Sequence, residues 1–247
     1  MTSERMLREE LCRGAKQLYE GGHNAPADGN LSARVGMNAL LTTPSGRHKA
    51  TLRANEIVKI RLSDGGVIGG GCPSSELKMH LAIYRARPDV RAIVHAHSPN
   101  AVGLTVAGHS LEDPVVPEAI QTLGGIPTVP YASPTTQAVA QAVLPYALRF
   151  NAFILERHGS VTLGADLAEA LSRLEVVEHV ARITVAALAA GGASPIPHEE
   201  AARLRRMAVE AGVLRPDPAS TPARGLSLQE EALVERLVER VLARLRA

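Results

Sequence analysis

Apolar residues recur at helical spacing near the start of the chain and again in its second half. The pattern predicts a helix over about residues 3–19, which Gly21-Gly22 ends. It also predicts a helix around residues 136–144 and a long helix from about residue 166 to 190. Shorter apolar segments with a different character separate these helices.

These shorter segments are bounded by turn residues and predict strands. They cover residues 30–35, 39–43, 57–62, 90–97 and 153–155. Pro73-Ser74-Ser75-Glu76 opens a further helix, which Pro88 ends, because serine caps helices and glutamate suits their first turn. The mixture of short strands and helices with brief connections indicates a layered α/β domain over residues 1–212.

The composition changes toward the C-terminal end of the chain. Residues 213–225 have the proline, serine and glycine content of a linker. Residues 226–247 predict a short amphipathic helix, with one apolar stripe made of Val234, Leu237, Val238, Val241, Leu242 and Leu245. Such a helix cannot bury its stripe alone, so we expect it to dock on another surface.

Overall composition narrows the classes of protein to consider. The 27 basic and 25 acidic residues give a formal charge of +2, and aromatic residues make up only 2%, so we expect no nucleic-acid partner. No stretch approaches the roughly 18 apolar residues of a membrane span. Two isolated cysteines do not make a disulfide framework. We therefore expect a cytoplasmic protein without a membrane partner.

The strongest local chemical signal is a group of three histidines. His95-Ala96-His97 ends an apolar strand, and the strand period of two places both imidazoles on the same side of the sheet. His158 follows another apolar strand and precedes Gly159, which permits a tight turn. Three imidazoles with one open position are typical of a catalytic divalent-metal site. Surface or buried structural histidines are the alternative.

Small polar motifs accompany the histidines. Glu76 fits a fourth metal ligand, a general base, or an acidic residue placed by the helix dipole. Ser74 and Ser75 fit either a phosphate site at a helix N-terminus or ordinary helix caps. Gly29-Asn30 and Ser45-Gly46 fit either an anion pocket or simple turns.

Five of these motifs follow one another in a characteristic order. They are Gly29-Asn30-Leu31-Ser32, Thr43-Pro44-Ser45-Gly46, Pro73-Ser74-Ser75-Glu76, His95-Ala96-His97 and Arg157-His158-Gly159. Over about residues 5–195 the chain thereby resembles the class II aldolase/adducin family, especially its L-fuculose-phosphate aldolase branch. The resemblance implies a three-layer α/β/α sandwich with a mixed, mostly antiparallel central sheet. It also implies a homotetramer with active sites between subunits.

The resemblance further implies a metal-dependent aldehyde-lyase. Its substrate would be a ketose 1-phosphate of the L-fuculose, rhamnulose or 5-deoxyribulose type, cleaved to dihydroxyacetone phosphate and a short aldehyde such as lactaldehyde. Zn²⁺, or another divalent ion such as Mn²⁺, would be bound by His95, His97, His158 and Glu76. Glu76 would be a metal ligand at rest and the acid/base for the enediolate when substrate displaces it. The substrate phosphate would be held by Asn30, Ser45, Gly46, Ser74 and Ser75.

One position departs from that branch. The aldolases that this chain resembles carry a tyrosine shortly before the Gly124-Gly125 pair, where this chain has Glu118. A glutamate here is similar to the methylthioribulose-1-phosphate dehydratase branch, in which it acts as the base. A dehydratase or decarboxylase that uses Glu118 as a catalytic residue is therefore the alternative function. If Glu118 has no catalytic role, it is a solvated glutamate at the start of a helix. A non-catalytic adducin-like interaction module is a third reading, which the retained histidines oppose.

The tail carries a resemblance of its own. A proline-rich linker followed by a terminal amphipathic helix is similar to an encapsulation peptide of a bacterial microcompartment, which binds shell or cargo proteins through its apolar face. This resemblance implies a location inside such a compartment. A helix that contacts another subunit is the alternative for residues 226–247.

Overall fold

The computed structural model describes residues 3–217 of the 247. Residues up to Arg215 belong to one compact unit, and a second unit begins at Pro216. The predicted terminal helix at residues 226–247, and the linker beyond residue 217, lie outside the described residues. Within the described range, no helix combines the length and apolar character that crossing a membrane requires.

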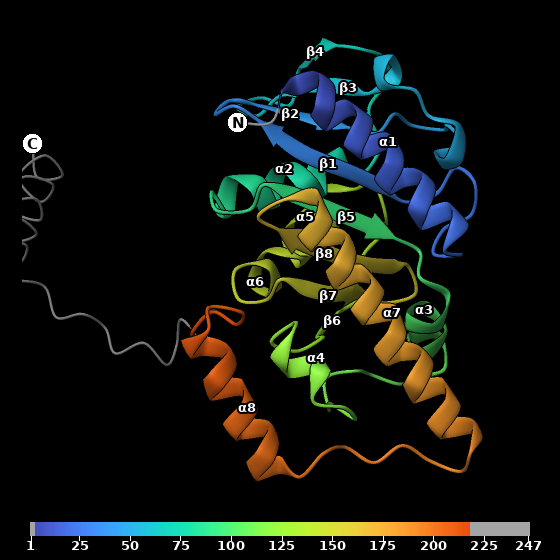
Figure 1. Ribbon diagram of the computed structural model, residues 1–247, viewed down its shortest axis with the longest axis vertical. Coiled ribbons are helices and arrows are strands. Elements are labelled where there is room, and N and C mark those ends of the chain that lie inside the picture. The colour runs from blue at the N-terminus through green and yellow to red at the C-terminus, as the bar shows by residue number, and fades with distance from the viewer. Residues whose placement is uncertain (1–2, 218–247) are drawn as a thin grey trace, which may run out of the picture. The chain divides into compact units, whose positions relative to one another are not determined.

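The described residues form one eight-stranded sheet in the order β4-β3-β2-β1-β5-β8-β7-β6 (Figure 1). All neighbouring strands pair antiparallel except β6 and β7, which are parallel. The predicted mixed, mostly antiparallel sheet is therefore confirmed. The strands are β1 (Asn30–Val35), β2 (Ala39–Thr42), β3 (Val58–Arg61), β4 (Val67–Gly69), β5 (Ala92–Ala96), β6 (Thr128–Val129), β7 (Ala152–Leu155) and β8 (Gly159–Gly164).

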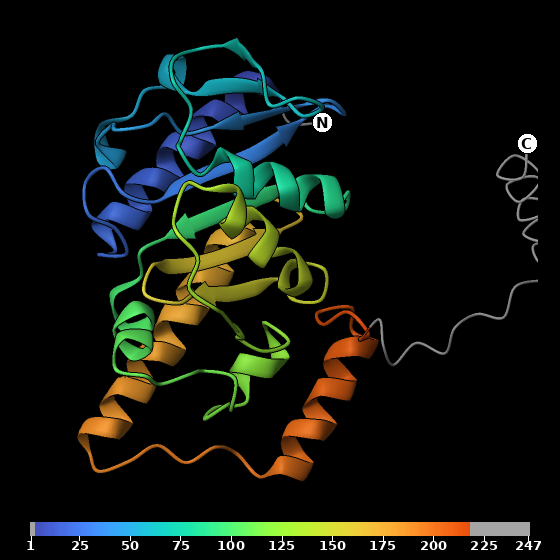
Figure 2. The same ribbon diagram turned by 180° about the vertical axis from the view of Figure 1, so that it is seen from behind.

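Helices cover both faces of the sheet, which confirms the three-layer α/β/α architecture. Figure 1 shows α1 (Glu4–Glu20) and α7 (Leu167–Ala189) across one face. Figure 2 shows α2 (Leu77–Ala86), α5 (Gln137–Ala142) and α6 (Leu144–Ala147) across the other. The remaining helices are α3 (Pro99–Val106), α4 (Glu118–Gln121), α8 (His198–Glu210) and two 3₁₀ turns, η1 (Lys49–Thr51) and η2 (Ala54–Glu56).

The alternation along β5 explains how one strand serves both layers. Ala92, Val94 and Ala96 join the core beneath α1 and α7. Ile93 joins the core beneath α2 and α5 on the opposite face. Since side chains alternate along a strand, His95 shares the face of Ile93. The central strand therefore carries one histidine at its C-terminal end on an otherwise apolar face.

Several elements differ from the sequence prediction. The helix expected from Pro73 begins at Leu77, so Ser74 and Ser75 lie in the loop that precedes it. The helix expected around residues 136–144 is two short ones, because Pro145 occupies the first turn of α6 and lacks the N–H that would continue α5. The pattern also missed β8, whose serine, threonine and terminal glycines weaken the apolar signal.

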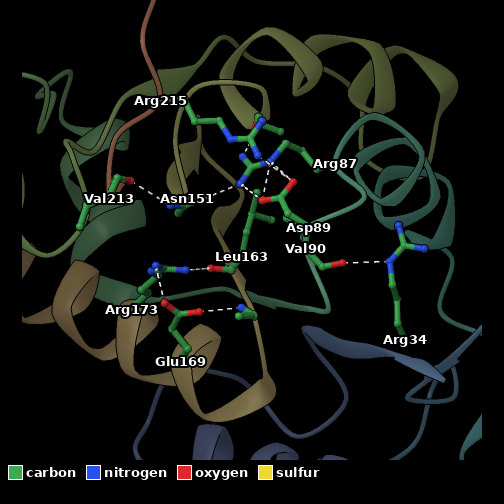
Figure 3. A network of polar contacts seen from close by, with 12 residues as sticks. Arg34, Arg87, Asp89, Val90, Asn151, Leu163, Glu169, Arg173, Val213 and Arg215 are labelled. Carbon is green, nitrogen blue, oxygen red and sulfur yellow. Dashed lines mark hydrogen bonds and ion pairs between the residues drawn. The ribbon is translucent and has the colours of Figure 1, made fainter. Parts of the chain in front are cut away.

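A polar network lies at the end of the sheet where β5 begins (Figure 3). Arg87 is buried and donates to Asp89, to the Ala147 carbonyl and to Asn151 Oδ1. Asp89 also accepts from Arg215 at 2.8 Å. The Arg87 hydrogen bond holds the pKa of Asp89 at about 2, so the pair persists in mild acid. The network fastens the last residues of the compact unit to the start of β5.

We expect Arg87→Ala to destabilise the fold by about 2–4 kcal/mol, because it leaves buried acceptors on Ala147 and Asn151 without a donor. The measurement is chemical denaturation followed by circular dichroism, with Arg61→Ala as the control. Arg61 forms an exposed pair with Asp64, which is expected to contribute less than about 1 kcal/mol. Equal midpoints for the two variants would contradict the structural role given to Arg87.

Candidate active site

The first two histidines are placed by the end of the central strand. His95 is the fully buried penultimate residue of β5, and His97 follows the strand's last residue. The His97 backbone N–H donates to Asn24 Oδ1 at 2.8 Å, which fixes the chain as it leaves the sheet. The two rings have centroids 5.1 Å apart. The H-x-H spacing therefore brings both imidazoles to one location, as the strand period predicted.

The third histidine is placed by the turn between β7 and β8. Arg157 has a positive φ of 56°, and its N–H donates to Thr105 Oγ1 at 2.9 Å. At Gly159 a Cβ would lie 2.4 Å from the Ala96 carbonyl oxygen and 2.8 Å from His95 Cε1. Only glycine allows the turn to approach β5 so closely. His158 consequently lies with its ring centroid 4.9 Å from that of His95 and 5.0 Å from that of His97.

Glu76 brings a carboxylate to the three imidazoles from the N-terminal end of α2. The side chain is buried, with Oε2 lying 3.0 Å from His95 Nε2 and Oε1 lying 3.1 Å from His158 Nε2. Asn30 Nδ2 donates to Oε2 at 2.9 Å. Burial raises the pKa of Glu76, but the His95 and His158 imidazoles outweigh burial and bring the pKa well below its usual range. The carboxylate is therefore ionised.

The donor set fits a divalent ion. One ligand atom from each of Glu76, His95, His97 and His158 lies within 4.8 Å of all the others. His95 Nδ1 donates to the Ser160 carbonyl at 2.9 Å, which leaves Nε2 as the nitrogen that faces the carboxylate. Neither His95 Nε2 nor Glu76 Oε1 makes a hydrogen bond, although both atoms are buried. Three nitrogens and a carboxylate are the ligand types that Zn²⁺ prefers.

The protonation of the cluster agrees with this fit. Burial lowers the pKa of His95, but Glu76 outweighs burial and raises the pKa overall, so the space between them attracts positive charge. Burial and the neighbouring imidazoles lower the pKa of His97 to about 4, which keeps its ring neutral. A neutral imidazole is the form that binds a metal. Asp28 Oδ2 lies 3.5 Å from His97 Nδ1 and orients that ring.

A pocket of about 310 Å³ opens beside the cluster. It is lined by Glu76, His97 and His158, while the buried His95 lies beneath it. The residues predicted to hold phosphate all line the same pocket, namely Asn30, Ser45, Gly46, Ser74 and Ser75. The structure thus brings together every sequence-predicted site residue except Glu118.

Backbone contacts hold the loops of this pocket against one another. The Ser45 N–H donates to the Cys72 carbonyl at 3.0 Å, and Pro44 forms a bridge with Pro73. Gly29 has a φ of 65°, and a Cβ there would lie 2.7 Å from the His95 carbonyl oxygen. The loop before β1 therefore packs directly on the end of β5. Three loops that are distant in sequence form one polar cradle.

Sequence comparison identifies this arrangement. A family model described as the class II aldolase and adducin N-terminal domain matches residues 9–185. The chain belongs to the class II aldolase and adducin family. This confirms the resemblance drawn from the five motifs, and its relatives are lyases, so the chain is an enzyme of that class.

Individual relatives within the family differ in the reaction they are named for. The chain is 33% identical over 184 residues to 3-oxo-tetronate 4-phosphate decarboxylase of Escherichia coli strain K12, covering 73% of this chain and 86% of that one. It is 36% identical over 175 residues to L-fuculose phosphate aldolase of Methanococcus vannielii, covering 71% and 93%. The crystal structure of YgbL, a putative aldolase/epimerase/decarboxylase from Klebsiella pneumoniae, superposes with a TM-score of 0.76. That structure is 33% identical and covers 83% of this chain and 100% of its own.

Class II aldolases use a divalent metal, typically Zn²⁺, and the Glu76–histidine cluster is where this chain fits one. The cofactor predicted from the sequence is therefore supported by both the family and the donor set. Asn30 makes a contact that the sequence did not indicate. Besides lining the pocket, its side-chain amide donates a hydrogen bond to the Glu76 carboxylate.

Glu118 lies elsewhere in this member of the family. It is the exposed first residue of α4, a helix that packs on α7 and α8, and it does not line the pocket of its own chain. Its catalytic role stays a prediction. Two residues that the sequence analysis passed over do line the pocket, namely Asp28 and Lys49. The one available signal was their position next to the Gly-Asn and Ser-Gly motifs.

Proposed function

We propose that this protein is a metal-dependent carbon–carbon lyase that cleaves a ketose 1-phosphate to dihydroxyacetone phosphate and a short aldehyde. L-Fuculose, rhamnulose and 5-deoxyribulose 1-phosphates are the substrates we assign to it. The observation that carries the proposal is the ionised Glu76 carboxylate, held between His95 and His158 at the wall of a pocket with a cradle of hydroxyls. Such a pocket suits a small molecule with a phosphate at one end and a polar reacting centre at the other.

The residues divide the work of this reaction between them. Ser45, Gly46, Ser74 and Ser75 hold the phosphate, which fixes the sugar's carbonyl end toward the histidines. The three histidines, together with Glu76 until the substrate displaces it, would hold a divalent ion, which would supply Lewis acidity for the ketone and the enediolate. Glu76 takes the proton of the hydroxyl that becomes the aldehyde and returns it to the enediolate carbon. Asn30 keeps the carboxylate pointed at the reacting carbon through its 2.9 Å hydrogen bond.

A β-oxo acid phosphate is a second candidate substrate, favoured by the 33% identity to 3-oxo-tetronate 4-phosphate decarboxylase. Loss of carbon dioxide from such an acid breaks the bond between the carboxyl carbon and the carbon next to the ketone, and it leaves the same enediolate of dihydroxyacetone phosphate. The two reactions then differ only in the fragment that leaves, an aldehyde or carbon dioxide. One set of residues therefore serves both, and in the decarboxylation Glu76 passes to the carbon a proton that it takes from solvent.

A coupled assay for dihydroxyacetone phosphate tests the proposal. The substrates are fuculose, rhamnulose, ribulose and 5-deoxyribulose 1-phosphates and 3-oxo-tetronate 4-phosphate, each with Zn²⁺ or Mn²⁺. We expect release from at least one of them, loss of activity after EDTA treatment, and recovery when metal is restored. Aldehyde and carbon dioxide are measured in parallel to tell the two reactions apart.

Two results would overturn the assignment in different ways. Consumption of substrate without a three-carbon product would indicate the dehydratase alternative and make Glu118 the residue to replace. No consumption by metal-loaded enzyme would reject the substrate class as a whole.

The assembly and location proposed for the enzyme rest on sequence alone. We propose a catalytic domain over residues 1–212, a linker over 213–225 and a terminal helix over 226–247. We also propose a homotetramer, in which Glu118 acts from another copy of the chain, and a location in a microcompartment through the terminal helix.

A further inference from the structure

Lys49 occupies an unusual position for a lysine. It begins the 3₁₀ turn η1, three residues after Gly46, and its side chain is only 1% exposed. It nevertheless lines the pocket beside Ser45 and Gly46. Burying an ammonium group is costly unless the group is paired with an opposite charge. A lysine kept in this position therefore calls for an explanation.

The hydrogen bonds of Lys49 include no carboxylate, although the Asp28 carboxylate lies near enough to raise the pKa of Lys49 and so to oppose part of the effect of burial. Nζ donates to the Ala27 carbonyl at 2.8 Å and to the Arg47 carbonyl at 3.2 Å. Its backbone N–H donates to the Pro26 carbonyl at 2.8 Å. An ammonium group has three N–H donors, so one is left for a ligand. Within the described residues Lys49 forms no ion pair with a carboxylate.

These contacts also place the ammonium group at the junction of two pocket loops. The Pro26 and Ala27 carbonyls belong to the loop that leads to Gly29-Asn30, and Lys49 itself follows the Ser45-Gly46 turn. The side chain is thus held by both loops whose polar groups line the phosphate cradle. Because the Ala27 and Arg47 carbonyls fix the position of Nζ, the charge is preorganised and needs no rearrangement when a ligand enters.

The charges around the pocket are unbalanced without Lys49. Asp28 and Glu76 contribute two carboxylates, and Lys49 is the one lysine or arginine among the described lining residues. The ion bound at the histidines offsets Glu76 at the reacting end. A phosphate dianion at the other end would meet Asp28 and only neutral hydroxyls and amides unless Lys49 faced it.

We propose that Lys49 is the cationic group of the phosphate subsite, where its free N–H bonds the phosphate and makes the enzyme select phosphorylated over free sugars. This inference rests on the proposed function, because it assumes that a phosphorylated ligand occupies this pocket. Burial lowers the pKa of Lys49, and a bound phosphate dianion opposes that shift. The amine is therefore more firmly protonated in the occupied pocket.

The test compares dihydroxyacetone phosphate with dihydroxyacetone, which lacks only the phosphate. Binding to the metal-loaded enzyme is measured by calorimetry for the wild type and for Lys49→Gln, which keeps donors for the two carbonyls but loses the charge. We expect dihydroxyacetone phosphate to bind about 10- to 100-fold more weakly to Lys49→Gln, while dihydroxyacetone binds unchanged. Lys59→Gln is the matched control, since Lys59 pairs with Glu4 away from the pocket and is expected to change neither affinity.

Lys49→Met is made alongside, because an apolar side chain of similar length is readily buried and guards against misfolding of the glutamine variant. Unchanged affinity for dihydroxyacetone phosphate in either folded variant would overturn the inference. An equal loss of both ligands would also overturn it and would leave Lys49 as a structural link between the loops. If the wild type binds neither ligand, the proposed function fails, and inorganic phosphate is titrated instead. Weaker phosphate binding by the variants would still support the subsite, and absence of phosphate binding by the wild type would reject it.

Discussion

His95→Ala is expected to remove the bound metal and lower kcat/KM by about 10³-fold or more. His95 is fully buried, and its Nδ1 bond to the Ser160 carbonyl fixes Nε2 toward Glu76. Alanine deletes one of the four predicted ligands. The measurement is metal content by elemental analysis after gel filtration, together with turnover on the substrate identified by the coupled assay.

His179→Ala is the matched control for this experiment. His179 is an exposed histidine on α7, away from the pocket, so we expect full metal content and normal turnover. A His95→Ala enzyme that still contains one equivalent of metal and turns over normally would remove His95 from the site. Circular dichroism of both variants separates loss of metal from loss of fold.

Glu76→Gln is expected to lower kcat by about 10²- to 10⁴-fold with little change in KM or in metal content. Glutamine keeps the size of the side chain and an oxygen that accepts the Asn30 hydrogen bond. It cannot take or return a proton, so the loss falls on the chemical step rather than on substrate binding. The measurement is steady-state kinetics over a range of substrate, with metal content determined on the same samples.

The control for the glutamate variant is Glu175→Gln. Glu175 is exposed on α7 and bonds Gln17, so its loss of charge is expected to leave both kinetic constants unchanged. Near-normal kcat in metal-loaded Glu76→Gln would show that the carboxylate is not the acid/base. A rise in KM alone would instead place Glu76 in substrate binding.

The site could be predicted from the sequence to the extent that its chemistry is local. His95 and His97 share a strand end, and Ser74, Ser75 and Glu76 share a loop before a helix, so spacing alone places each group. The meeting of His158 with His95 depends on Gly159, which lets the turn that carries His158 come into contact with Ala96. That approach is a tertiary contact, and the sequence indicated it only through the family resemblance.

Lys49 shows why the remaining features could not be predicted. On the sequence it is one lysine among four, with no acidic neighbour, and only its position shortly after Ser45-Gly46 distinguishes it. Its burial depends on carbonyls from residues 27 and 47, which a periodicity analysis does not register. In the same way, α8 mixes charged and apolar residues. Its Leu204 and Ala208 are buried only because they pack on Ile120 of α4, and this tertiary contact could not be predicted from the sequence.

The place of β5 in the sheet has a consequence for how this enzyme is made. β5 pairs with β1 through Asn30 and His95 and with β8 through His95 and Val161, and both neighbours are distant in sequence. Pairings of this kind form late and slow the folding of a domain. During synthesis, His95 and His97 emerge long before His158, so the nascent chain has these motifs without the complete ligand set. We therefore expect metal loading to follow folding, and bound ion to stabilise the finished domain by mass action.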